Sequence, residues 1–162
     1  MEGVRPADPR DVPVCARLLS EASRSAATRR GGPSLVADRA PDGPPVGADG
    51  DRSGAALASW ATGAGHVLLA GTLDDAVVGV AAGHVRTLAT ERLGVVDCLY
   101  VEPDARGVGL GSALTAAVVA EFGRLGCVAV DAPALPGDRE TKQRFEAAGF
   151  SARLVVLHRR LP

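Results

Sequence analysis

An apolar run over residues 93–101 predicts the central strand of the chain. It reads L-G-V-V-D-C-L-Y-V, in which Asp97 is the one charged residue. Such a run, rich in β-branched residues and without alternation, predicts a strand that is buried on both faces. Pro103 and Asp104 follow and predict a turn out of the strand. Apolar positions at helical spacing then predict a helix over 110–125.

Shorter patterns on both sides of this unit predict the other elements. Asp74-Asp75 predicts a tight hairpin turn between two strands. Asp8, followed by a proline, predicts the start of the first helix. The predicted strands cover 2–6, 66–73, 76–86, 127–131 and 152–159, and the further helices cover 9–27, 55–62 and 138–148. Residues 87–92 are predicted to be a polar connection into the central strand.

Residues 31–54 are rich in Gly, Pro and Asp and show no periodicity. A stretch of this length without secondary structure is a functional loop or a flexible insertion, and both interpretations stay open. The chain has 162 residues, of which 46% are hydrophobic, enough to bury a core. We therefore expect one domain over 1–162 with a flexible segment at about 31–54.

Charge and composition argue against several classes of partner. A formal net charge of −1 and an aromatic content of 3% are unlike those of nucleic-acid or anionic-membrane binders. Cys15, Cys98 and Cys127 lie in apolar segments without paired spacing, which predicts reduced core residues and no metal site. No stretch approaches the roughly 20 apolar residues that span a bilayer, and residues 1–10 lack the apolar run of a signal peptide. We expect a cytoplasmic protein without nucleic-acid or membrane partners.

The strongest chemical pattern is R-G-V-G-L-G at 106–111, between the central strand and its helix. Glycines allow backbone N–H groups to approach a ligand closely, and the start of a helix favours negative charge. A strand, a glycine-rich turn and a helix start in this order predict a phosphate site. The alternative is a tight turn whose glycines only permit the helix to pack on the strand.

This stretch resembles the acyl-coenzyme A signature of the GNAT N-acetyltransferase superfamily, R/Q-x-x-G-x-G/A, with Arg106, Gly109 and Gly111 at the fixed positions. The preceding L-Y-V-E-P-D-A-R-G and the distal R-F-E-A-A-G-F are similar to further segments of that family. The resemblance covers about 77–150. It implies an α/β (α+β) GNAT fold, with a mixed central sheet of six to seven strands, about four flanking helices and the order β-α-α-β-β-β-α-β-α-β.

The resemblance also implies acetyl-CoA as co-substrate. In that family two parallel strands splay apart, here 93–101 and 127–131, and the pantetheine arm lies between them. Backbone amides of 107–111 would hold the pyrophosphate, with the Ser112 hydroxyl as a further donor. The cofactor-binding residues implied are Leu99, Tyr100, Val101, Arg106, Gly107, Val108, Gly109, Leu110, Gly111, Ser112, Asp138 and Phe145.

Amine acetylation needs a base for the ammonium proton. Asp97 is the first candidate, because burial among apolar neighbours raises a carboxyl pKa toward the useful range. Strand alternation predicts that it shares a face with Leu99 and Val101. Glu102, at the strand end, and His84, near the end of the adjacent strand, are the other candidates. A structural carboxylate bonded to a neighbouring Arg or His is the alternative for Asp97.

Two positions depart from the family pattern. Phe145 stands where the resembled segment carries a tyrosine general acid, and Asp138 stands where an asparagine lies near the phosphates. The missing hydroxyl predicts slower protonation of the leaving thiolate. A second hypothesis is therefore a catalytically impaired acyl-CoA-binding or regulatory module.

A Rossmann-type nucleotide-binding domain is the third hypothesis. Asp131 ends a predicted strand 20 residues after Gly111, as a ribose-binding acid would. The glycines do not form G-x-G-x-x-G, which counts against it. For the acetyltransferase interpretation, the acceptor is a small-molecule amine or a protein amine, and the resemblance leaves a homodimer open.

Overall fold

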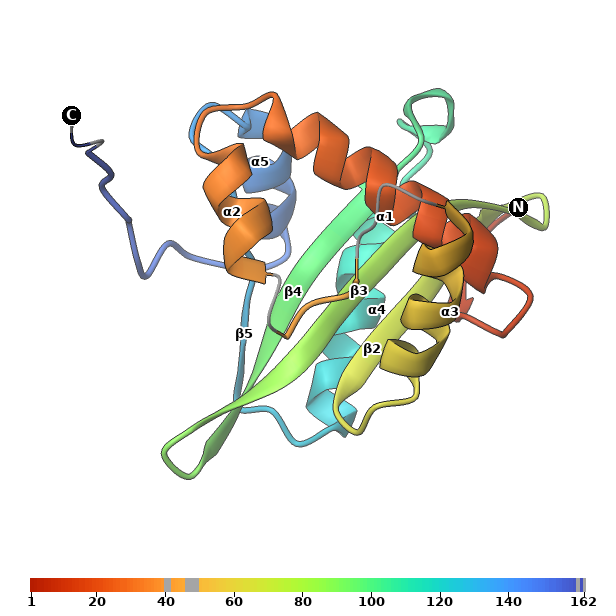
Figure 1. The fold of residues 1–162 in the computed structure, drawn as a ribbon, viewed down its shortest axis with the longest axis horizontal. Helices are drawn as coiled ribbons and strands as arrows, with labels where there is room; N and C mark the ends of the chain where they lie inside the picture. The colour runs from red at the N-terminus through yellow and green to blue at the C-terminus, as the bar shows by residue number, and fades with distance from the viewer. Residues whose placement is uncertain (40–41, 46–49, 160, 162) are drawn as a thin grey trace.

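The computed structural model describes residues 1–39, 42–45, 50–159 and 161, without the side chains of residues 39 and 50–53. The described residues form one five-stranded sheet of order β1-β2-β3-β4-β5 (Figure 1). Neighbours from β1 to β4 are antiparallel, whereas β5 is parallel to β4. The strands are β1 (Glu2–Pro6), β2 (His66–Leu73), β3 (Ala76–Leu88), β4 (Glu91–Val101) and β5 (Ala129–Asp131).

Helices cover both faces of this sheet, because strand side chains alternate between faces and each apolar face needs cover. Helices α1, α2 and α3 lie on one side, and α4 crosses the other with α5 beside it (Figure 1). None of the helices in the described part of the chain is long and apolar enough to cross a membrane. The helices are α1 (Val12–Ala27), α2 (Gly32–Arg39), α3 (Gly50–Ala61), α4 (Leu110–Arg124) and α5 (Arg139–Ala147).

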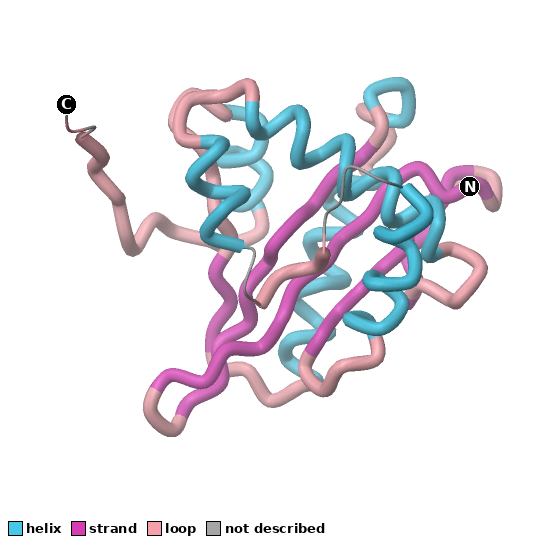
Figure 2. The backbone as a smooth tube through the Cα atoms, viewed as in Figure 1, coloured by secondary structure: helices cyan, strands magenta, loops and turns pink. Residues whose placement is uncertain are grey.

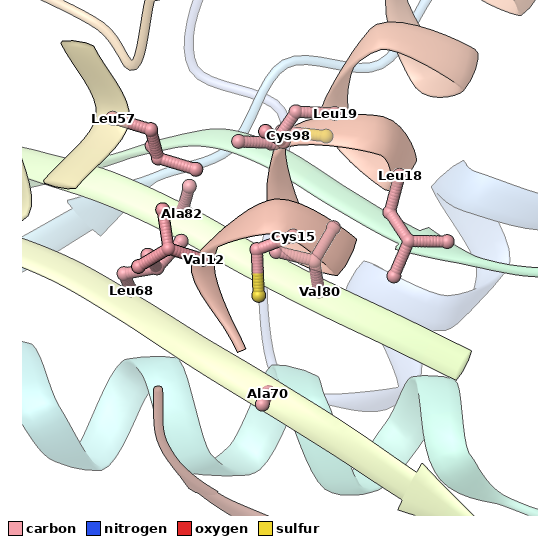
Figure 3. Packing of buried hydrophobic residues seen from close by; sticks show 11 residues of the cluster. Val12, Cys15, Leu18, Leu19, Leu57, Leu68, Ala70, Val80, Ala82 and Cys98 are labelled. Atoms are coloured by element: carbon pink, nitrogen blue, oxygen red, sulfur yellow. The ribbon is translucent and has the colours of Figure 1, made fainter. Parts of the chain in front are cut away.

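Two apolar clusters fill the two layers, and β3 shows how they are separated. Its Val80 and Ala82 contribute to the cluster under α1 and α3, whereas Ala81 contributes to the cluster under α4. The first cluster joins side chains of α1 and α3 to those of the strands (Figure 3). The second is built around α4, and its buried members include Leu110, Leu114, Val118, Phe122 and Phe145.

Most predicted elements are confirmed, with shifted boundaries. The first helix begins at Val12 and not at Pro9, since Asp8 and Asp11 form a turn in which the amide of Asp11 donates to the carbonyl of Asp8. Residues 87–92 are not a separate connection, because β3 and β4 continue to a turn where Ala89 has a φ of 53°.

The segment 31–54 contains structure that the sequence patterns did not predict. Helix α2 lies within it, and α3 begins at Gly50, before the predicted start at residue 55. The expectation of a flexible segment also falls on residues 40–41 and 46–49, which lie outside the described residues.

The predicted strand over 152–159 is wrong. This segment pairs with no strand and extends away from the sheet as an irregular chain (Figure 2). Its apolar side chains are exposed, from 71% for Leu154 to 91% for Leu157. The edge strand β5 pairs with β4 over three residues only, so it offers a short template. The described residues therefore give a sheet of five strands, not six to seven.

Candidate active site

The strands β4 and β5 run together and then separate. Leu93, Gly94 and Val95 of β4 pair with β5, whereas β4 continues from Val96 to Val101 without a partner on that side. This open edge forms one wall of a cleft, whose other walls come from the end of α1, from α2, from the loop after β5 and from α5. Backbone N–H and C=O groups on an unpaired strand edge are free to bond a ligand.

The glycine-rich turn leads from the end of β4 into α4. Gly107 and Gly109 have φ values of 85° and 96°, which L side chains rarely adopt, and Gly109 is the N-cap of α4. The turn is exposed. The side chain of Leu110, in contrast, is buried in the core at 1% exposed, so only the backbone of this residue could contact a ligand. A positive-φ turn at the start of a helix is suited to an anion.

Two guanidinium groups lie next to this turn. Arg106 donates from Nε to the carbonyl of Val101 at 3.0 Å, and its guanidinium lies 5.8 Å from the centre of the Tyr100 ring. Arg144 of α5 lies against Gly111, where an added Cβ would come within 2.9 Å of the arginine Nε. Both arginines line the cleft. Sequence reasoning missed Arg144, because nothing local indicates that α5 packs against the start of α4.

The charge of Asp138 is compensated. Its carboxylate caps α5 by accepting from the amide and hydroxyl of Thr141, at 3.2 and 2.9 Å, and it forms an ion pair with Arg29 at the end of α1. Asp138 lines the same cleft as Phe145. Arg29 was not predicted, since it comes from a part of the sequence remote from α5. The negative charge at position 138 is thus paired by a cation that the sequence pattern does not reveal.

Phe145 lines the cleft with an apolar ring. Its side chain is buried and its ring centre lies 5.1 Å from that of Phe150. The phenyl ring offers no hydroxyl to a leaving group. The chain's one tyrosine, Tyr100, also lines the cleft, and burial is the main cause that raises the pKa of its hydroxyl.

A β-bulge in β4 sets the direction of Asp97. Ala82 of β3 pairs with Cys98 and Gly83 pairs with Val96, so Asp97 is the extra residue between them. A bulge adds one residue without a partner and redirects side chains around it. The carboxylate of Asp97 meets Nδ1 of His84 at 2.7 Å. Both side chains are buried, Asp97 at 1% and His84 at 8% exposed.

The alternation predicted for Asp97 is wrong because of this bulge. Leu99 and Val101 pack in the cluster under α4. Asp97 instead contacts His84. The residue before His84 is Gly83, where an added Cβ would meet Phe122 of α4. Since neighbouring strand residues face opposite sides of the sheet, His84 faces away from α4. Asp97 is therefore turned to the opposite face from Leu99 and Val101. It still lines the cleft, whereas His84 is not among the lining residues.

The surroundings of the pair raise the pKa of His84. The hydrogen bond that the carboxylate of Asp97 accepts is the largest cause of the raised pKa, burial opposes it, and the charges of Asp97 and Asp42 add to the increase. His66 lies opposite His84 in the neighbouring strand and stacks on Trp60, with ring centres 4.4 Å apart. Glu102, the other predicted carboxylate, pairs with Arg17 at 2.7 Å and is not among the residues that line the cleft.

We expect Asp97→Asn to lower the pKa of His84, because the substitution removes the anionic partner. NMR titration of the His84 ring protons measures this pKa in both proteins. The raised pKa also makes the free energy of unfolding depend on pH. The charged pair contributes its full stabilisation below the pKa of a histidine in the unfolded chain, about 6.5. That contribution is lost as the pH rises through the folded-state pKa. An unchanged His84 pKa in the variant would contradict the pairing.

Comparison with known proteins identifies the family. The chain matches the acetyltransferase (GNAT) family over residues 34–150, which is more than half of its length. The chain therefore belongs to the GNAT acetyltransferase family, and the mixed sheet described above is consistent with the GNAT fold. No curated protein matches the sequence.

Solved structures share the fold at low identity. One is AAC(6′)-Iy in complex with the bisubstrate analogue CoA-S-monomethyl-acetylneamine, 15% identical, with a TM-score of 0.71 and 99% of each chain covered. A ribosomal-protein-alanine N-acetyltransferase from Brucella melitensis biovar Abortus 2308 is 18% identical, with a TM-score of 0.70 and 99% of each chain covered. A transcriptional regulator from Bacillus halodurans C-125 is 15% identical, with a TM-score of 0.72, covering 99% of this chain and 100% of that one.

Proposed function

We propose that this chain transfers an acetyl group from acetyl-CoA to a primary amine by direct attack in a ternary complex. The observation that carries the proposal is the continuity of the open β4 edge with the positive-φ turn at the start of α4. A free strand edge suits an amide-containing chain, and the turn with Arg106 and Arg144 suits a pyrophosphate. Residues 107–112 are not among those that line the cleft, but they follow Arg106, which does. The donor sets of the cleft and of the adjacent turn together fit acetyl-CoA, which supplies the thioester when bound.

The residues have separate tasks in this proposal. Backbone groups of 99–101 hold the extended part of the co-substrate, and those of 107–111, with Ser112, hold its phosphates. Arg106 and Arg144 offset the phosphate charge, while Arg29 and Asp138, which form an ion pair, line the cleft. None of these groups forms a covalent bond to the acetyl group, since the amine attacks directly.

The Asp97–His84 pair accepts the proton of the incoming ammonium. Asp97 lines the cleft and meets the acceptor, and His84 positions the carboxylate through the 2.7 Å contact. As the new N–C bond forms and the C–S bond breaks, the thiolate takes its proton from water, because Phe145 has none to give. The pair must start deprotonated, so we expect kcat/KM to rise with pH through its apparent pKa.

An acetyl-transfer screen tests the proposal. The protein is incubated with acetyl-CoA and a panel of amines that includes aminoglycosides, polyamines, amino acids and peptides with free N-termini. Release of the CoA thiol and the mass of the acetylated product are measured together. Product formation with any amine class supports transfer and identifies the acceptor as a small molecule or a protein amine. Acetyl-CoA binding without product from any amine would contradict catalysis.

The second candidate, an acyl-CoA-binding module with impaired catalysis, is favoured by Phe145 alone. Its buried ring lines the cleft and carries no hydroxyl that could protonate the thiolate. We expect Phe145→Tyr to raise kcat, because the new hydroxyl supplies that proton, with an effect in the lower part of the roughly 10²–10⁴-fold range of general acids. Single-turnover kinetics measure the step. An unchanged rate in a variant that binds acetyl-CoA normally would show that thiolate protonation does not limit the reaction.

The third hypothesis fails on the fold. A Rossmann domain requires a parallel sheet, whereas three of the four strand pairs here are antiparallel. Asp131, the candidate ribose-binding acid, bonds Arg153 at 2.7 Å instead.

A further inference from the structure

The carboxylate of Asp97 is directed to one side of the sheet only. It contacts His84, which faces away from α4, so it points toward the layer of α1 and α2. The turn that we propose for the phosphates leads into α4, on the opposite side (Figure 1). In the proposed function, on which this inference rests, Asp97 accepts the ammonium proton. The acceptor amine therefore approaches Asp97 from the side of α1 and α2.

On this side the cleft has an apolar wall, made by α1, α2 and the loop after β5. The wall consists of Ala22, Ala26, Leu35, Pro133 and Leu135, which all line the cleft and are all half-buried. Its two parts meet at the corner between α1 and α2, where a Cβ added at Gly31 would lie 3.7 Å from Cδ2 of Leu135. An apolar substituent that covers these side chains releases water from them, which favours its binding.

The charged side chains near this wall already have partners. Among the described residues that line the cleft, the acids are Asp97, Asp138 and Glu140. Asp138 forms an ion pair with Arg29, and Glu140 accepts from Nη2 of Arg144 at 2.7 Å. Asp97 is reserved for the reacting amine. A second ammonium on the acceptor would find no unpaired carboxylate among these residues, and a carboxylate on the acceptor would compete with Asp138 for Arg29. Either charge is costly to bury without a partner.

We propose that the acceptor is a small primary monoamine with an apolar substituent, and that it carries neither a second ammonium nor a carboxylate. Its ammonium meets Asp97, and its substituent lies against the apolar wall. Leu35 is a specificity-determining residue, because it is the large apolar side chain that α2 contributes to the wall. Selectivity then comes from favourable contact with the apolar substituent and from the cost of leaving a second charge unpaired.

Three amines of the same chain length test this selectivity. Pentylamine has an apolar end, cadaverine replaces that end with a second ammonium, and δ-aminovalerate replaces it with a carboxylate. Release of the CoA thiol from acetyl-CoA gives kcat/KM for each amine at one pH and ionic strength. We expect kcat/KM per amino group to be at least about tenfold higher for pentylamine than for either charged analogue. A value for cadaverine or δ-aminovalerate that equals or exceeds that for pentylamine would overturn the proposal.

Leu35→Asp tests the assigned residue, because it places a carboxylate in the apolar wall. We expect this variant to raise the ratio of kcat/KM for cadaverine to that for pentylamine by at least about tenfold. Val36→Asp is the matched control, since Val36 is the next residue of α2, is also half-buried and does not line the cleft. We expect its ratio to stay within about twofold of the wild type. An unchanged ratio in a Leu35→Asp protein that binds acetyl-CoA normally would show that Leu35 does not set the selectivity.

A binding measurement separates this inference from the proposed function. In the protein saturated with free CoA, NMR follows the methyl signals of Leu35 during titration with pentylamine and with cadaverine. We expect pentylamine to shift these signals at a concentration at least about tenfold lower than cadaverine. If acetyl-CoA binds and no amine is acetylated, the proposed function fails, while this binding preference still supports the apolar wall. Transfer to amines without a preference for pentylamine in either measurement leaves the proposed function standing and refutes the inference.

Discussion

Gly109→Glu is expected to lower the affinity for acetyl-CoA by at least about 100-fold, which corresponds to about 2.7 kcal/mol. Gly109 is the N-cap of α4 and has a φ of 96°. A Cβ added at this position would lie 3.3 Å from a carboxylate oxygen of Glu2. A glutamate side chain at this position brings a negative charge into the turn that we propose for the pyrophosphate. It also strains the backbone that aims the amides. Isothermal titration calorimetry measures the loss.

Gly126→Glu is the matched control. Gly126 lies after the other end of α4 and has a φ of 77°, with no atom within 4 Å of an added Cβ. Both substitutions therefore impose a similar backbone strain and the same charge, but only one of them changes the turn. We expect Gly126→Glu to bind acetyl-CoA within about twofold of the wild type. Equal losses in the two variants would assign the effect to stability and not to the phosphate turn.

Asp97→Asn is expected to reduce kcat/KM by about 10²–10⁴-fold while leaving acetyl-CoA affinity near the wild-type value. Asparagine keeps the shape of the side chain and can still bond His84, but it cannot accept the ammonium proton. Steady-state kinetics with the acceptor found in the screen measure the loss, and calorimetry checks the binding of acetyl-CoA.

The control for Asp97 is Asp11→Asn. Asp11 is also a buried carboxylate, 7% exposed, and it accepts from Nη2 of Arg5 at 3.0 Å, outside the cleft. Loss of this pair is expected to lower stability without changing the rate per folded molecule. A fall in kcat/KM for Asp11→Asn as large as that for Asp97→Asn would mean that the effect is structural.

Local patterns predicted the turn at 106–111 and the elements on both sides of it. Glycines at positive φ, a strand and a helix start are adjacent in sequence, so their geometry follows from short-range rules. The pairing of Asp97 with a histidine was among the alternatives because His84 lies on the next strand. The predicted side-chain direction of Asp97 was wrong at the β4 bulge, because the sequence pattern does not show where a strand carries an extra residue.

Contacts between distant segments account for the rest. Arg29 reaches the cleft because the end of α1 lies beside the start of α5, and Arg144 reaches it because α5 lies against the start of α4. No local pattern encodes either contact. The segment 152–159 has the composition of a strand, but a strand needs a partner edge as well as propensity. In the described structure the segment does not pair with the edge strand β5. The composition of the segment therefore predicted a strand pairing that the described structure lacks.

A thermal-shift measurement with acetyl-CoA, free CoA and NAD tests whether the chain binds coenzyme A. A ligand that binds only the folded state raises the melting temperature, and at 100 times its Kd it adds about 2.7 kcal/mol to stability. We expect an increase with both CoA species and none with NAD. No increase with acetyl-CoA at millimolar concentration would contradict it, and the glycines at 107–111 would then serve only the packing of α4 on the sheet.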